Sequence, residues 1–186
     1  MRKKFILWAS VLVLSVLAAA PVAVADDEQD WEDDEAPIYE PRADSVSLLD
    51  GAVVIPRPTG WNVAEVGKGA VAVFRSATDE RARIEVRMST GISERRWERY
   101  WRSFDTELRQ AGFDAYQGRT SRRFGSRQGL IYEYELSRSE SENYRLVVWH
   151  THESDRAWVF TIFFAENRRD AYLPTFHEML NEVTWP

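Results

Sequence analysis

The stretch AWVFTIFFA, residues 157–165, decides the fold. Almost every side chain in it is apolar, and successive side chains of a β-strand point to opposite faces of the sheet. A strand that is apolar on both faces must be covered on both sides. We therefore expect this stretch to be the central strand of a sheet that lies between two other layers.

The residues on the N-terminal side of this stretch predict the rest of the sheet. Three longer runs with a period of two and polar or glycine-containing turns between them indicate antiparallel strands. Farther upstream, the Asp50-Gly51 pair between SVSLL and AVVIP is typical of a hairpin turn. The strand runs are AYQGRTSRRF (115–124), GLIYEYELSR (129–138), YRLVVWHTH (144–152), WNVAEV (61–66), AVAVFRSA (70–77) and ARIEVRM (82–88).

Two segments have the three- and four-residue spacing of amphipathic helices. The first is ERRWERYWRSFDTELRQA, residues 94–111, which Ser93 can cap at its start and Gly112 can end. The second covers residues 169–183, where Pro174 is tolerated if it falls in the first turn. The apolar faces consist of Trp97, Tyr100, Trp101, Phe104, Leu108 and Ala111 in the first helix, and of Tyr172, Phe176, Met179, Leu180 and Val183 in the second.

These elements predict an α+β fold. An antiparallel sheet of about six or seven strands would lie between the two helices, as an α/β/α sandwich. The aromatic stripe of the first helix is expected to pack on this sheet, because large aromatic side chains contribute most of the apolar area that a core buries.

The N-terminus is expected to be an export signal. MRKKF is a basic segment, ILWASVLVLSVLAAA is an apolar one, and AVA at 23–25 has the small residues of a cleavage site, so 1–25 is interpreted as a signal peptide. The processed protein would be periplasmic or secreted and would have no transmembrane segment. The chain has no cysteine, which excludes disulfides and attachment of lipid to a lipoprotein-type cysteine.

The next segment, residues 26–44, is expected to be a disordered acidic arm. It contains ten acidic residues and one base, Arg42. Its few apolar side chains cannot offset the entropic cost of ordering it. The arm is either a solvated spacer or a tether for a basic partner, with Trp31 as the anchor. The folded domain is expected to span 45–186.

Several spaced motifs accompany this order of elements. They are PTGW at Pro58–Trp61, LRQAGF at Leu108–Phe113, and the closing FHEML with its later tryptophan. Together they resemble the PsbP, Mog and DcrB superfamily over about residues 46–185. The resemblance implies an accessory or binding role without a shared catalytic centre: photosystem assembly and ion retention for PsbP-like members, GTPase binding for Mog-like members, and envelope lipoproteins for DcrB-like members. This chain lacks the lipoprotein cysteine, and no functional residue carries over.

Two pairs of residues are candidates for chemistry. His150 and His152 share one face of a strand and are weak candidates for a metal site, but a strong zinc site needs more ligands, so we expect no metal or other cofactor. Glu133 and Glu135 share a face as glycosidase carboxylates do, but the alternation around them indicates a solvated row. Since no nucleophile with a base is visible, we expect no enzymatic activity.

The candidate binding residues belong to two groups. The first is the aromatic group on the predicted helix, and the second is an arginine cluster on one hairpin, which has the charge to contact an anionic surface, a partner or the acidic arm. We expect no nucleic-acid partner, because the domain is exported and has no net charge. We predict an exported, non-enzymatic binding or accessory protein of the cell envelope with an unknown protein partner. The alternatives are a carrier of a small apolar ligand between the aromatic helix and the sheet, and a metal-assisted hydrolase that uses the two histidines. The two groups are Trp97, Trp101 and Phe104, and Arg119, Arg122, Arg123 and Arg127.

Overall fold

The computed structural model describes residues 41–42, 44–67, 69–139, 142–153 and 155–186. The predicted signal peptide and residues 26–40 of the predicted arm lie outside these residues. Within them the chain forms a seven-stranded antiparallel sheet, a three-stranded sheet and two α-helices. The predicted α+β fold is confirmed.

The large sheet has the strand order β4-β5-β6-β10-β9-β8-β7. The stretch AWVFTIFFA lies in β10, the fourth of these seven strands, so its predicted central position is confirmed. β7 and β4 form the two edges. The bounds are β4 (Trp61–Val63), β5 (Ala72–Ser76), β6 (Arg83–Ser89), β7 (Asp114–Phe124), β8 (Arg127–Ser139), β9 (Glu142–Glu153) and β10 (Arg156–Ala165).

The small sheet contains the predicted hairpin. Its strands β2 (Ser45–Leu48) and β3 (Val53–Pro56) pair antiparallel, and Leu49, Asp50 and Gly51 between them all have positive φ. The connection therefore spans residues 49–52 and is longer than a two-residue turn. A short strand, β1 (Pro41–Arg42), pairs with β2, so ordered backbone begins within the segment that the sequence assigned to the arm.

Both predicted helices form. Helix α2 spans Glu94–Gln110, and Gly112 follows it with a φ of +90°, a conformation that glycine adopts without strain. Helix α3 (Arg169–Glu182) follows a short 3-10 helix, η1 (Glu166–Arg168). Pro174 lies inside α3 as its sixth residue, beyond the first turn, where we expected a proline to be tolerated. The buried face of α3 therefore offsets the cost of a proline within the helix.

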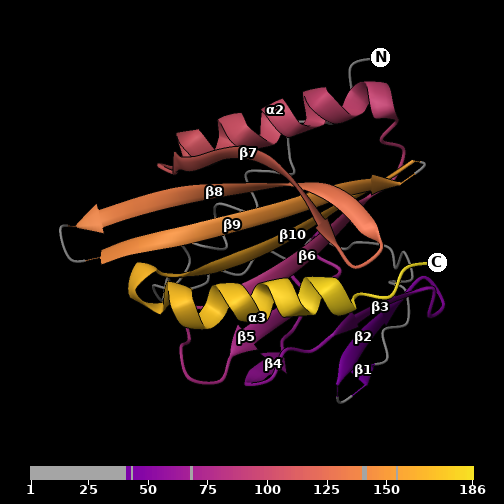
Figure 1. Cartoon of the computed structure of the whole chain (residues 1–186), viewed down its shortest axis with the longest axis horizontal. Helices are drawn as coiled ribbons and strands as arrows, with labels where there is room; N and C mark the ends of the chain where they lie inside the picture. The colour runs from indigo at the N-terminus through magenta and orange to yellow at the C-terminus, as the bar shows by residue number, and fades with distance from the viewer. Residues whose placement is uncertain (1–40, 43, 68, 140–141, 154) are drawn as a thin grey trace, which may run out of the picture.

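The two helices cover opposite faces of the sheet, as Figure 1 shows. Alternate side chains of β10 point to each layer: Phe160 and Phe164 pack toward α3, whereas Val159 and Phe163 pack toward α2. The core is thus two clusters separated by the sheet, and the small sheet lies with the α3 cluster. This division is the α/β/α sandwich expected from the sequence.

Gly129 in β8 makes room for a neighbouring side chain. A Cβ atom at this position would lie well inside 3.0 Å of both the Trp149 indole and the carbonyl oxygen of His150. The indole crosses Gly129 and donates a hydrogen bond from Nε1 to the carbonyl oxygen of Arg122 in β7 at 3.4 Å. A glycine here lets the tryptophan lie flat across two strands.

We therefore expect Gly129→Ala to lower the free energy of unfolding by about 1–3 kcal/mol, the usual cost of overpacking a core. Urea melts of the two chains measure this difference. Gly118→Ala in β7 is a suitable control, because no atom lies within 4 Å of the position that its Cβ would take. Equal effects of both substitutions would show that the Trp149 contact does not restrict position 129.

Candidate binding cleft beside helix α2

The aromatic stripe of α2 is divided between core and surface. Trp101 and Phe104 are buried against the sheet, and Trp97 is half-buried near the start of the helix. The space between Phe104 and the sheet is filled by side chains of the α2 cluster, among them Tyr134 and Phe163. The stripe thus acts mainly as packing surface.

Four rings form a stacked layer between α2 and the sheet, which we call the aromatic layer: Trp97, Trp101, Tyr132 and His150. The Trp101 and His150 ring centroids are 3.9 Å apart with an interplanar angle of 15°, and those of Trp101 and Tyr132 are 4.3 Å apart. Trp97 closes the other side of His150 at 4.6 Å. The imidazole is thus enclosed by aromatic rings.

His150 is a buried polar group without a polar partner. Its exposed fraction is 1%, and neither ring nitrogen has a hydrogen-bond partner among the described residues. Burial lowers its pKa to about 3, and the positive charge of Arg119 contributes a second, smaller lowering. The ring is therefore neutral at physiological pH and serves as a flat packing element.

His152 points to the same face of β9 but has a different environment. Its Nε2 donates a hydrogen bond to the carbonyl oxygen of Ile92, in the loop before α2, at 2.5 Å. Trp97 contacts both histidine rings. Within the part of the chain that the structure describes, no group of three or more histidine or acidic side chains is placed to hold a metal ion.

The expectation that these histidines do not bind a metal tightly stays a prediction. Adding zinc to the purified protein should give no thermal shift that depends on His150 or His152, since Zn²⁺ sites need three or four converging ligands. The measurement compares the native chain with His150→Ala and His152→Ala. A shift of several degrees that both substitutions abolish would contradict it.

A cleft of about 420 Å³ opens between α2 and the β7–β8 ribbon. Trp101, Tyr132 and Tyr134 form its floor. The Tyr134 hydroxyl donates to Asp105 Oδ1 at 2.9 Å, whereas the Tyr132 hydroxyl has no partner among the described residues. Burial raises the pKa of Tyr132 to about 12, so this buried hydroxyl keeps its proton. Irregular pairing of β7 with β8 around Gln117 shapes the outer wall.

Arginine side chains border this cleft, from Arg102, Arg109 and Arg119, and two more continue along the same side of α2. Arg95, Arg99, Arg102 and Arg109 recur along the solvent side of α2, and Arg119 joins them from β7; we call these five the arginine face.

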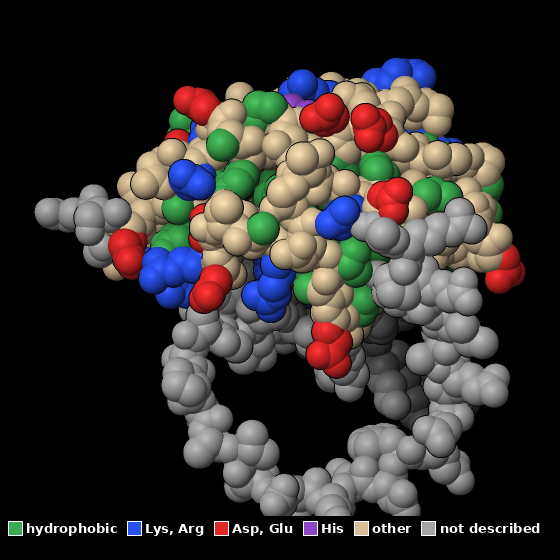
Figure 2. Space-filling view, turned by 90° about the horizontal axis from the view of Figure 1, so that it is seen from below, with side chains coloured by type: hydrophobic (Ala, Val, Ile, Leu, Met, Phe, Trp, Pro, Cys, Tyr) green, Lys and Arg blue, Asp and Glu red, His purple; other side chains and the backbone are tan. Residues whose placement is uncertain are grey.

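Among the described residues, Glu98 and Asp105 form ion pairs with the arginine face. Glu98 lies 3.2 Å from Arg119 and 3.5 Å from Arg102, and Asp105 lies 3.0 Å from Arg109. These pairs are exposed, so they hold the arginines weakly. Figure 2 shows the side of the molecule that faces away from α2, and there acidic and basic side chains are interspersed. The arginine face is therefore a local excess of positive charge.

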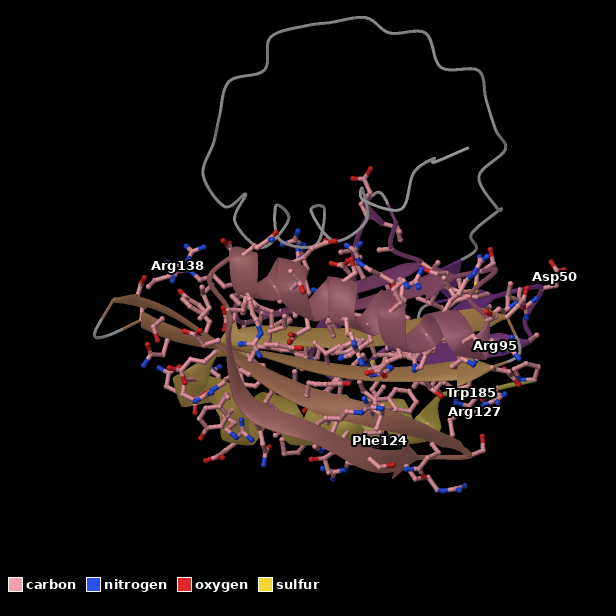
Figure 3. All side chains as sticks on the ribbon, turned by 90° about the horizontal axis from the view of Figure 1, so that it is seen from above. Asp50, Arg95, Phe124, Arg127, Arg138 and Trp185 are labelled. Atoms are coloured by element: carbon pink, nitrogen blue, oxygen red, sulfur yellow. The ribbon has the colours of Figure 1, made fainter. Side chains whose placement is uncertain are left out.

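The four arginines predicted on the hairpin do not form one patch. Arg119 belongs to the arginine face. Arg122 lies over the Phe124 ring at 5.1 Å, and Arg127 pairs with Glu153 and lies over the Trp185 ring at 5.3 Å. Figure 3 places Arg127 and Trp185 together near one end of the molecule, with Phe124 nearer its middle. The fourth, Arg123, is exposed on β7. Adjacent residues of a strand face opposite sides, which divides the cluster.

Our sequence interpretation missed the arginines of α2. Arg95, Arg99 and Arg102 have the four- and three-residue spacing of one helix side, which identifies a basic amphipathic helix. We instead assigned the binding role on this helix to its aromatic residues, which lie on the opposite face. Only the fold shows that Arg119, twenty residues after Arg99, lies beside them.

The prediction that Glu133 and Glu135 form a solvated row is wrong for Glu133. Its exposed fraction is 7%, and Arg169 of α3 forms two hydrogen bonds to its carboxylate, at 2.7 and 3.1 Å. Glu135 is half-buried and pairs with Arg145 at 2.9 Å. Arginines on the α3 side of the sheet pair with both carboxylates. This pairing lets the charged groups be buried, since an unpaired buried charge is strongly destabilising.

A second hollow, of about 410 Å³, lies beside Arg81, Tyr144 and Glu166. Its charged groups are already paired: Arg81 with Tyr144 and Glu142, and Glu166 with Arg145. It lacks the aromatic floor of the cleft beside α2. We therefore take the α2 cleft with the arginine face as the candidate site. Among the described residues, no helix has the length and hydropathy needed to cross a membrane.

Comparison with known proteins identifies the fold. No family model matches the sequence, and no curated protein matches it. Solved structures do match. One is CyanoP, the cyanobacterial PsbP of Synechocystis sp. PCC 6803, at 17% identity and a TM-score of 0.56, covering 78% of this chain and 95% of that one. Another is LpqN of Mycobacterium tuberculosis, described as involved in cell envelope biogenesis, at 12% identity and a TM-score of 0.52, covering 71% and 82%.

A third similar structure comes from Bacteroides thetaiotaomicron, at 11% identity and a TM-score of 0.57. The alignment covers 77% of this chain and only 48% of that one, so this chain spans about half of its length. At these identities the likeness shows the fold alone. The resemblance to a PsbP-like fold that the sequence motifs indicated is confirmed.

Proposed function

We propose that this protein is an exported, non-enzymatic accessory protein of the cell envelope that binds an acidic protein partner through the arginine face. In this proposal residues 1–25 are removed as a signal peptide and residues 45–186 form the binding domain. The periplasm or the outside of the cell is its location.

The observation that supports this proposal is the arginine face around an aromatic floor. Arginine and aromatic side chains are the residues that most often dominate the energy of protein interfaces. Arg102 has an exposed fraction of 78%, so its guanidinium can pair with a carboxylate without first losing a buried partner. The half-buried Tyr132 ring lies at the base of the same cleft, above the buried Trp101. This combination suits an acidic segment that also carries an apolar side chain.

The similar structures also support an accessory role. CyanoP is a PsbP protein, and LpqN is described as involved in cell envelope biogenesis. These are statements about those proteins, and they favour an accessory role over catalysis for this fold. We extend that role to this chain as part of the proposal.

The alternative of a carrier for a small apolar ligand has less support. Of the three aromatic residues proposed to line its pocket, only Trp101 borders the cleft, while Phe104 lies in packed core. The cleft volume is near the lower limit of small-molecule sites, about 300–1,000 Å³. The metal-assisted hydrolase has less still, because His150 is enclosed by rings and His152 is hydrogen-bonded to a backbone carbonyl.

Chemical cross-linking in native envelopes tests the proposal. The exported chain is compared with a variant carrying Arg95→Glu, Arg99→Glu and Arg102→Glu. A matched control reverses three exposed arginines elsewhere, Arg75, Arg123 and Arg138. We expect a cross-linked partner with the native chain and the control, and its loss in the α2 variant. A partner that the α2 variant retains would contradict binding through this face.

A further inference from the structure

We propose that the acidic segment DDEQDWEDDE, residues 26–35, of one copy of this protein docks on the arginine face of a second copy, with Trp31 in the aromatic cleft. This inference rests on the proposed function, because it names an occupant for the same site. Two copies of the protein would thus associate through this charged segment.

Charge complementarity is the first argument. Residues 26–35 contain eight carboxylates and no base. The arginine face presents five guanidinium groups, and its ion pairs are those of Arg102 and Arg119 with Glu98 and of Arg109 with Asp105. From Arg95 to Arg109 the helix rises about 21 Å, and an extended chain covers the same length with about six residues. An acidic segment lying along α2 can therefore meet each arginine in turn.

The position of the tryptophan is the second argument. Trp31 lies in the middle of the acidic run, with carboxylates on both sides. The cleft has the matching order: an aromatic floor of Trp101, Tyr132 and Tyr134 with arginines on both sides. Indole rings stack favourably on aromatic faces and on guanidinium groups.

The position of β1 favours a second copy over the same one. Strand β1 starts at Pro41, and in Figure 1 it lies at the end of the molecule opposite to α2. Pro41 lies ten residue steps after Trp31, and these steps reach at most about 35 Å when fully extended. For comparison, the six strand spacings that separate β4 from β7 in the large sheet amount to about 29 Å. A neighbouring copy requires no such detour.

A spin label on the acidic segment tests this directly. The chain has no cysteine, so Gln29→Cys gives a single labelling site that leaves Trp31 in place. The processed chain, beginning at Asp26 and carrying a nitroxide at this site, is mixed with an isotope-labelled native chain, and broadening of the backbone amide signals is recorded. We expect broadening at Arg95–Arg109 and Ala115–Arg119, and its loss in 1 M salt, where the screening length is about 3 Å.

Three variants define the interaction. Trp31→Ala in the spin-labelled chain should weaken the broadening, and so should Arg95→Glu, Arg99→Glu and Arg102→Glu in the isotope-labelled chain. Reversal of Arg75, Arg123 and Arg138 should leave it unchanged. No broadening at α2, broadening that survives 1 M salt, or broadening seen only when both labels are in one chain would each overturn the proposal.

The two proposals fail separately. If the amides of α2 are unaffected by the spin label while envelope cross-linking still depends on Arg95, Arg99 and Arg102, then self-association is wrong and the partner-binding function stands. If the broadening occurs while cross-linking is unchanged by these substitutions, then the acidic segment is an occupant of the face and the envelope partner binds elsewhere.

Discussion

Replacing Trp101 with alanine is expected to lower the free energy of unfolding by about 3–5 kcal/mol, the usual range for deleting a buried large aromatic side chain. Only 4% of Trp101 is exposed, and its ring packs on His150, Tyr132 and Phe104, with the farthest of these centroids at 4.9 Å. Its removal leaves a cavity between α2 and the sheet. Denaturant melts measure the loss.

Arg102→Ala is the control for this substitution. It changes the next residue of the same helix, whose side chain points to solvent, so a change within about 0.5 kcal/mol is expected. A loss under about 1 kcal/mol for Trp101→Ala would mean that the α2 layer does not depend on this ring. The floor of the proposed cleft would then be free to rearrange.

The second large effect is a loss of stability in acid that depends on His150. Above pH 6.5 the imidazole is neutral whether the chain is folded or unfolded. Below that pH the unfolded chain binds a proton that the folded chain refuses until about pH 3, because burial lowers the folded pKa. Lowering the pH from 6.5 towards 3 therefore lowers the free energy of unfolding, by about 1.4 kcal/mol per pH unit.

Urea melts at pH 7 and pH 4.5 measure this loss. We expect the native chain to lose about 2.5 kcal/mol more between these pH values than His150→Phe, which keeps a flat ring and removes the titrating group. His177, whose pKa burial lowers to about 4, adds a separate loss in both chains.

Tyr132→Phe is the matched control, since it alters the same aromatic layer without removing a group that titrates in acid. It should follow the native chain. If His150→Phe and the native chain instead lose equal stability, the folded protein accepts a proton on His150 near its ordinary pKa. The closed aromatic layer would then have to open in solution.

The elements of the fold were predictable because each has its own local pattern. The double-faced apolar run at 157–165, the helix spacing between Ser93 and Gly112, and the turn around Asp50 need only neighbouring residues to be recognised. The position of Pro174 within its helix was not predictable, because the start of α3 depends on how its buried face packs. Helix ends are set by a small difference between local cost and tertiary gain.

The candidate site was predictable only in part. The sequence identified Trp101 and Arg119 separately, but nothing local indicated that they line one cleft. It also identified His150 as a weak candidate for a metal ligand, whereas the fold encloses it among rings from α2 and β8. Contacts between elements distant in the chain depend on register and on the angle of the helix, and neither has a signature in nearby residues.

By itself, then, the amino-acid sequence determined the period of each element, which face of each is apolar, and the separation of charge between residues 26–44 and the rest of the chain. Those properties depend on side-chain chemistry at fixed spacings. Only the tertiary structure decided which charges are buried. It pairs Glu133 with Arg169 from another layer, leaves His150 without a partner, and gathers Arg119 with the arginines of α2. Burial and pairing depend on what the rest of the chain places nearby, so they arise only when the layers pack.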